Sequence, residues 1–148
     1  MKSLGFMRPY GLVALVLVGG SLPGCGKAKQ PWEKVVPASG VIVYNGKPLA
    51  GAQILLIPED EKFPSSVRPS ATSGDDGTFQ IGTYSHKDGA PEGGYKAVVL
   101  HYPVVGPKEN PTVGANDLPA KYAKPTTTDL RVEITAKNSD VLELTLKK

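Results

Sequence analysis

Apolar residues recur in short stretches along residues 39–148, with turn-forming residues between them. The last two stretches, 130–135 and 142–146, alternate cleanly between apolar and polar positions. A period of two is typical of a β-strand that buries one face. The stretch 95–102 is more continuously apolar, which is typical of a strand buried on both faces. We expect strands near residues 41–44, 52–57, 70–73, 78–81, 95–102, 130–135 and 142–146.

The segments between these stretches carry turn chemistry. Asn45-Gly46 follows the first expected strand, and both residues of this pair tolerate a positive φ. Gly74-Asp75-Asp76-Gly77 and Lys137-Asn138-Ser139-Asp140 stand in similar positions later in the chain. No stretch beyond residue 24 keeps a helical period over three turns. The pattern therefore predicts an all-β protein, an antiparallel seven-stranded β-sandwich.

Choosing one face of each expected strand gives a predicted core. A slip of one residue would exchange the two faces of a strand, so each choice depends on register. The predicted core residues are Val41, Val43, Ile54, Leu56, Phe79, Ile81, Ala97, Val99, Val132, Ile134, Leu142 and Leu144.

The segment 103–129 contains five prolines and no clear period. A loop of this length in a compact domain is usually functional or mobile. Its aromatic and basic residues make it a candidate surface for a protein partner, formed by Tyr102, Lys121, Tyr122 and Lys124. A carbohydrate-binding surface would instead need exposed aromatic rings, for which the candidates are Tyr44, Tyr84, Tyr102 and Tyr122.

The first 24 residues have the parts of an export signal. Lys2 and Arg8 supply positive charge, and residues 12–18 form an apolar run. That run is shorter than the ~20 residues that span a bilayer. Small residues follow it, and then Cys25, the only cysteine of the chain.

Leu22-Pro23-Gly24-Cys25 resembles a bacterial lipobox, although proline is unusual before the glycine. The resemblance implies a lipid on the Cys25 thiol and cleavage before Cys25. Several acyl chains hold a protein on a membrane firmly, whereas one binds only marginally. We therefore expect a signal peptide at 1–24, a lipidated tether at 25–38 and a domain at 39–148. Gly26 in place of aspartate favours the outer membrane, by analogy with enteric bacteria.

The tether is expected to be a spacer, because it carries prolines and charges without a period. Trp32 is its exception, and we expect this side chain either to pack on the edge of the domain or to contact the membrane or a partner. Removing residues 1–24, with Lys2 and Arg8, lowers the formal net charge from +3 to +1. No clustered basic face remains, so nucleic-acid binding is not expected.

The residues that carry catalysis or hold metals are sparse. The two histidines, His86 and His101, are too few for a usual three-ligand zinc site, and His86 with Asp88 is expected to be part of a solvated loop. No serine stands in a Gly-x-Ser-x-Gly elbow. Asp75-Asp76-Gly77 lacks the further ligands of a calcium loop, which favours a turn. We therefore expect no enzyme activity, no metal and no cofactor.

Three segments of the domain are similar to carboxypeptidase-regulatory-like domains, which are prealbumin-like (transthyretin-like) sandwiches. The segments are Gly40 to Pro58, Ala71 to Phe79 and Pro91 to Val99. The stretch Leu118 to Leu130 further resembles a group of planctomycete-type lipoproteins. The resemblance implies a Greek-key sandwich without a catalytic set. A related branch hydrolyses 5-hydroxyisourate, but this chain ends Leu-Thr-Leu-Lys-Lys and lacks that branch's C-terminal motif.

These observations predict a non-catalytic, lipid-anchored protein on the extracytoplasmic side of the cell envelope. Its β-sandwich would bind or support an envelope protein or polymer. The alternative is a carbohydrate- or peptidoglycan-binding sandwich lipoprotein.

Overall fold

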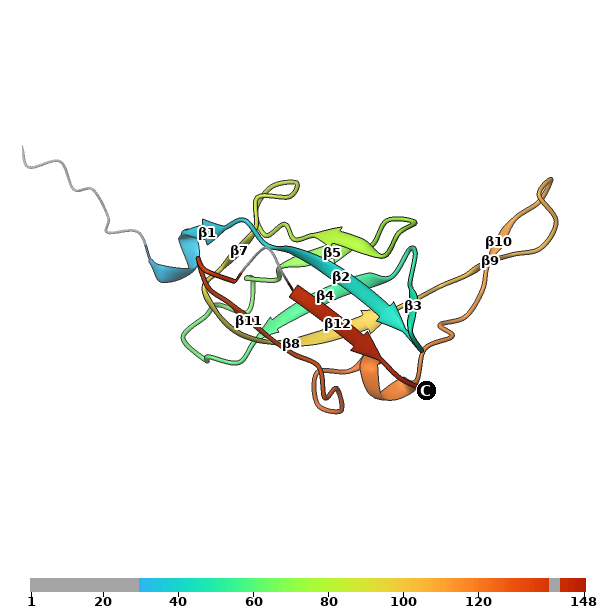
Figure 1. Ribbon diagram of the computed structural model, residues 1–148. Coiled ribbons are helices and arrows are strands. Elements are labelled where there is room, and N and C mark those ends of the chain that lie inside the picture. The colour runs from blue at the N-terminus through green and yellow to red at the C-terminus, as the bar shows by residue number, and fades with distance from the viewer. Residues whose placement is uncertain (1–29, 139–141) are drawn as a thin grey trace, which may run out of the picture.

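The computed structural model describes residues 30–138 and 142–148, which fold mainly into β-strands (Figure 1). The signal peptide, Cys25 and part of the turn at 137–140 lie outside the described residues. Strands lie at all the expected positions: β2 (Ser39–Tyr44), β4 (Gln53–Pro58), β5 (Ser70–Thr72), β6 (Thr78–Gln80), β8 (Gly93–Leu100), β11 (Arg131–Ile134) and β12 (Leu142–Leu146). The described residues add shorter elements: η1 (Pro31–Glu33), β1 (Val35–Val36), β3 (Lys47–Pro48), β7 (Ala90–Pro91), β9 (Val104–Val105), β10 (Thr112–Val113) and η2 (Ala120–Ala123).

Two four-stranded sheets form the body of the molecule. The first has the order β11-β8-β4-β5, and each neighbouring pair is antiparallel. In the second, β2 pairs with β12, β3 and β6. The β12–β2 pair is parallel, which the sequence pattern did not predict. Consecutive strands β11 and β12 belong to different sheets, so no hairpin turn fixes the direction of β12.

The buried apolar side chains of both sheets form one cluster between them. All the predicted core residues on β4, β6, β8, β11 and β12 belong to it, as does Ile81 just after β6. Tyr95, Leu118, Tyr122 and Leu146 join the same cluster. Every buried side-chain nitrogen or oxygen of the described residues has a hydrogen-bond partner. The core therefore contains no buried polar side-chain atom that lacks a hydrogen bond among the described residues.

The first long strand buries the face opposite to the predicted one. Ile42 is 0% exposed, whereas Val41 and Val43 are only half-buried, so the prediction for β2 is wrong by one residue. Gly40 shares the face of Ile42 and pairs with Leu142 of β12. A Cβ on Gly40 would collide with the Leu142 carbonyl, so the close approach of these strands requires glycine here.

The segment 31–38, expected as spacer, is instead joined to the domain. Strand β1 pairs with β7, and Val36 is buried. A Cβ on Gly89, just before β7, would collide with the Val36 carbonyl. The Trp32 ring lies 6.4 Å from the Phe63 ring, which meets Tyr95 edge-on at 6.3 Å between ring centres. Trp32 therefore packs on the domain edge, and any free spacer ends near residue 30.

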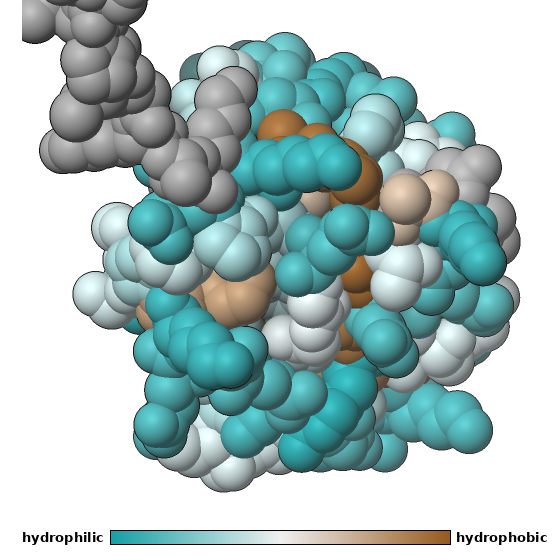
Figure 2. Space-filling model, turned by 90° about the vertical axis from the view of Figure 1, so that its left-hand side faces the viewer, coloured by the Kyte–Doolittle hydropathy of each residue, from teal (hydrophilic) through white to brown (hydrophobic). Residues whose placement is uncertain are grey.

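The segment 103–129, expected as an irregular loop, contains a small hairpin and a 3-10 turn. Strands β9 and β10 pair with each other and project from the body at the end opposite to η1 (Figure 1). Val104, Val105 and Val113 on this hairpin are 73%, 45% and 73% exposed. From the η1 side, by contrast, the surface is mainly hydrophilic, with hydrophobic side chains in narrow strips (Figure 2). No helix among residues 30–138 and 142–148 has the length and apolar character needed to cross a membrane.

Candidate functional site

The predicted partner surface is only partly on the surface. Tyr102 is 38% exposed at the start of the β9–β10 excursion, and Lys124 is exposed after η2. The Lys121 ammonium lies 3.2 Å from Asp129 Oδ2 and 4.6 Å from the centre of the Tyr122 ring. The contact with Tyr122, and then the ion pair with Asp129, raises the pKa of Lys121. Its charge is therefore already partnered within the chain.

Tyr122 does not belong to that surface, and this is a correction. Its side chain is 2% exposed. Its hydroxyl donates to the Lys147 carbonyl at 3.1 Å and accepts from the Lys147 amide at 3.0 Å. A ring held in this way cannot stack on a sugar or a partner. Tyr122 instead fastens η2 to the end of β12.

The two histidines lie in separate environments. His101 Nδ1 is 2.7 Å from Asp117 Oδ1, and the His101 amide donates to Asn116 Oδ1 at 2.9 Å. This contact closes the base of the β9–β10 excursion. His86 lies on the loop between β6 and β7. In the part of the chain that the structure describes, no three histidine, cysteine, aspartate or glutamate side chains gather around a possible metal position.

A groove of about 1500 Å³ lies where the edges of the two sheets meet. Strand β5 is the edge of the first sheet, and β6 borders the second. Reciprocal backbone bonds of 2.9 Å join Ser70 to Gly82, and the Gly74 amide donates to the Thr78 carbonyl at 2.8 Å. Between these two points no ladder joins the described strands β5 and β6. The seam is therefore closed at its ends and open along Thr72 and Gln80.

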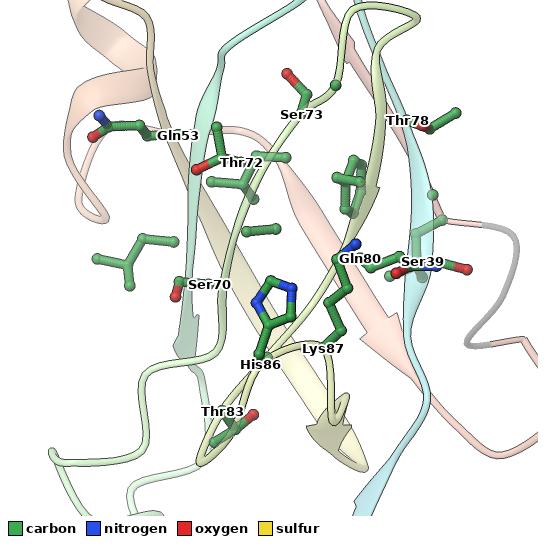
Figure 3. A pocket seen from close by; sticks show the side chains of 18 of the residues that line it. Ser39, Gln53, Ser70, Thr72, Ser73, Thr78, Gln80, Thr83, His86 and Lys87 are labelled. Atoms are coloured by element: carbon green, nitrogen blue, oxygen red, sulfur yellow. The ribbon is translucent and has the colours of Figure 1, made fainter.

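Many of the side chains along the walls of the groove carry hydroxyl or amide groups. Figure 3 shows them coming from both sheets and from the loop before β7. Ile54 and Phe79 also border the groove, with side chains that are buried in the core. The polar lining residues include Ser39, Gln53, Ser70, Thr72, Thr78, Gln80, Thr83, Ser85, His86 and Lys87.

Several of these polar side chains have no hydrogen bond within the described chain. Thr78 and Thr83 are bonded, to Asp76 Oδ1 and to the Gly89 carbonyl. The side chains of Gln53, Thr72 and Gln80 make no such bond to residues 30–138 or 142–148, and they remain available to a ligand. The bond from Thr78, first its hydroxyl and then its amide, lowers the pKa of Asp76 at the turn end of the groove.

The loop at the other end of the groove is held by one carboxylate. Asp88 accepts from the backbone amides of Thr83, Tyr84 and Ser85 at 2.7, 3.1 and 3.0 Å. Asp88 is thus used to hold the loop itself. Figure 3 shows His86 and Lys87 extending from this loop into the groove, toward Gln80.

Tyr84 lies at the same end and is 54% exposed. Its hydroxyl donates to the Trp32 carbonyl, which fixes the ring against the N-terminal segment. Partial burial, and then the charges of Glu33 and Asp88, raise the pKa of this hydroxyl. The hydroxyl therefore keeps the proton that it donates, and the ring stays in one place beside the groove.

This groove could hardly be predicted from the amino-acid sequence. Thr72, Thr78 and Gln80 occupy the solvent-facing positions of strands, where polar residues need no explanation. Their meeting depends on two sheet edges that are not neighbours in any ladder. The available signal was Tyr84, which was one of the candidate carbohydrate-binding aromatics and does line the groove.

No protein-family model matches the chain, and no curated protein matches it. Among solved structures, it is similar to a 9R-lipoxygenase from Cyanothece PCC8801, with a TM-score of 0.38 and 16% sequence identity. The match covers 81% of this chain and 17% of the lipoxygenase chain. So low a score assigns neither a fold family nor an activity, and function has to be argued from the sites.

Proposed function

We propose that the protein is a lipid-anchored, non-catalytic module of the bacterial cell envelope, and that the β5–β6 groove binds a carbohydrate polymer. The proposed ligand rests on one observation, which is that the groove is lined with hydroxyl and amide side chains. Several of them make no hydrogen bond within the described residues. Such groups both donate and accept hydrogen bonds, as sugar hydroxyls do, so each can form a hydrogen bond with a sugar hydroxyl in either direction. The fixed and half-exposed Tyr84 ring suits the apolar face of a sugar ring.

The fold proposed for this module is a seven-stranded Greek-key sandwich of the carboxypeptidase-regulatory-like type. Seven main strands in two sheets around one core support it. Gly46 and Gly77 also support it, because they adopt φ of 79° and 76° at the turns of the motifs that carry the resemblance. The proposal includes no catalytic role, since His101 is engaged with Asp117 and Asp88 with the loop backbone.

The anchor is proposed at Cys25, on the strength of the lipobox. Replacing Cys25 with serine should abolish acyl labelling and release the protein, or leave it unprocessed. Membrane retention and processing that did not change would remove this part of the proposal. Carbohydrate binding by the domain would stand independently of that result.

Carbohydrate binding can be tested with Thr72→Val, which removes a groove hydroxyl at almost constant volume. Thr126→Val is the matched control, because Thr126 is exposed and does not line the groove. We expect wild type and the control to bind a set of envelope polysaccharides and soluble peptidoglycan equally. Loss of one ligand hydrogen bond should weaken the Thr72→Val variant about five- to tenfold. Absence of binding by wild type to every glycan would refute the proposal.

The exposed valines of the β9–β10 hairpin favour a second candidate function, docking to an envelope protein. Exposed apolar side chains gathered on a projecting element are typical of protein contacts. Unpaired backbone groups along the hairpin edges argue against insertion in a bilayer. A crosslinker placed at Tyr102 should capture a protein partner of the wild type in intact envelopes. The double variant Val104→Thr, Val113→Thr should lose this crosslink and keep its affinity for glycans. Unchanged crosslinking would remove this candidate.

A further inference from the structure

Building on the proposed carbohydrate binding, we propose that the groove selects an acidic glycan and that Lys87 pairs with a carboxylate of this ligand. The observations behind it are the placement of Lys87, its lack of an ion pair within the described residues and the neutral polar groups beside it.

Lys87 adopts a backbone conformation that lysine rarely takes. Its φ is 59°, in the left-handed region, where a side chain is unfavourable and glycine or asparagine is usual. The three amide bonds to Asp88 hold the residues just before it and thereby fix this conformation. The result is an ammonium group directed into the groove rather than away from it (Figure 3). An unfavourable conformation that its surroundings enforce points to a use for the side chain.

The charge of Lys87 is unpaired within the described chain. The ion pairs of residues 30–138 and 142–148 involve His101, Lys121 and Arg131, and none involves Lys87. Among the acids nearby, Asp88 is bonded to three backbone amides. Asp76 accepts from Thr78 at the far turn, and Glu143, on the β12 side, accepts from Thr145. Glu33, whose charge acts on Tyr84 at this end of the groove, accepts from the Gln30 amide. The cation is therefore left for a ligand.

The groups around Lys87 indicate a sugar acid. A single ammonium complements one negative charge, whereas phosphate recognition usually gathers an arginine fork or several cations. Gln80 lies beside the end of the Lys87 side chain, and Ser70 and Thr72 lie on the opposite wall of the groove (Figure 3). These amide and hydroxyl groups suit the hydroxyls of a sugar that carries a carboxylate. A uronate polymer and a peptidoglycan strand with its peptide carboxylates share this chemistry.

The test measures the affinity of the full protein for three probes by calorimetry. They are an oligogalacturonate, the same oligomer with its carboxylates methyl-esterified, and a soluble muropeptide. We expect wild type to bind at least one acidic probe about fivefold more tightly than the neutral ester, as for a partly exposed ion pair. Added salt should reduce that preference. The acidic probe whose affinity depends on Lys87, the uronate or the muropeptide, identifies the source of the carboxylate.

Lys87→Gln should remove the preference, and Lys87→Arg should keep most of it. Lys47→Gln is the control, since Lys47 is exposed on β3 and does not line the groove. Thermal unfolding of each variant verifies that the fold is intact. Equal affinity for acid and ester in wild type, or equal effects of the two glutamine variants, would overturn this inference and leave carbohydrate binding standing. If wild type bound none of the three probes and no neutral glycan, the proposed function would be refuted as well.

Discussion

At the scale of single residues, solvent exposure in the structure distinguishes candidate binding residues that the sequence could not distinguish. Tyr122 and Tyr102 were equivalent candidates by type and position, yet one is buried in the core and the other is at the surface. Nothing in the pattern around Tyr122 distinguishes them, because it lies in a proline-rich segment without a period. Its burial results from the end of β12, which is distant in sequence and bonds the tyrosine hydroxyl through Lys147.

The hydroxyl of Tyr122 should therefore contribute to stability. Tyr122→Phe keeps the ring and leaves both backbone groups of Lys147 without this partner, which should lower the free energy of unfolding by about 1–2 kcal/mol. Tyr102→Phe is the control and should change it by less than about 0.5 kcal/mol. Urea unfolding measures both values, and equal values for the two variants would contradict the assigned contact.

Tyr95 predicts how stability responds to alkaline pH. Its side chain is 0% exposed, its hydroxyl donates to the Pro91 carbonyl at 2.7 Å, and burial strongly raises its pKa above the ordinary 10.0. The unfolded chain therefore loses this proton first as the pH rises. The stabilising contribution is complete below pH 10.0 and decreases above it, by up to about 1.4 kcal/mol per pH unit. Tyr84 adds a smaller effect of the same sign.

Unfolding in urea between pH 9 and 11.5 tests this dependence. Tyr95→Phe cannot ionise, so its stability should fall less steeply with pH than that of wild type, even if it is less stable at pH 7. Parallel curves for the two proteins would show that another group causes the alkaline loss.

At the scale of elements, the sequence predicted where strands lie better than how they face. Strands β11 and β12 alternate cleanly, and their core residues were predicted correctly. Strand β2 contains four successive apolar residues, Val41 to Tyr44, so its pattern gives no preferred face. The contact of Gly40 with Leu142 sets the face instead, and that partner lies at the other end of the chain. The groove was hidden for a similar reason, because it is formed by the edges of two different sheets.

Gly40→Ala should strongly disturb the β2–β12 pair. The added Cβ meets backbone, which cannot move as a flexible side chain would. We expect a loss of about 2–3 kcal/mol in the free energy of unfolding, typical of an overpacked site. Gly94→Ala on β8 is the control, since its Cβ would meet only the carboxylate end of the Glu59 side chain, at 3.4 Å, and no backbone. If both variants melt at the same temperature, the close approach at Gly40 does not govern the pair.

At the scale of the whole molecule, the N-terminal segment orients the proposed binding surfaces. Four residues separate Cys25 from Gln30, and an extended chain spans at most about 3.6 Å per residue. A lipid at Cys25 would therefore keep η1 within about 20 Å of the bilayer surface. The β9–β10 hairpin, at the opposite end, would then point away from that membrane (Figure 1). The groove end at Tyr84 would lie near the anchored side, because Tyr84 bonds the Trp32 carbonyl.

This orientation depends on the attachment of the segment 31–38 to the domain. Limited proteolysis can measure how firmly the segment is attached. Trp32→Ala removes the ring contact with Phe63, and we expect about 1–2 kcal/mol of local stabilisation to be lost. Because cleavage follows the population of the opened segment, trypsin should then cut after Lys34 about tenfold faster. Cleavage after Lys108, in the distant hairpin, should keep its rate and serves as an internal control. If Trp32→Ala leaves both rates unchanged, the β1–β7 pairing alone holds the segment. If wild type is cut after Lys34 as fast as after Lys108, the segment is free, and a lipid at Cys25 would not orient the domain.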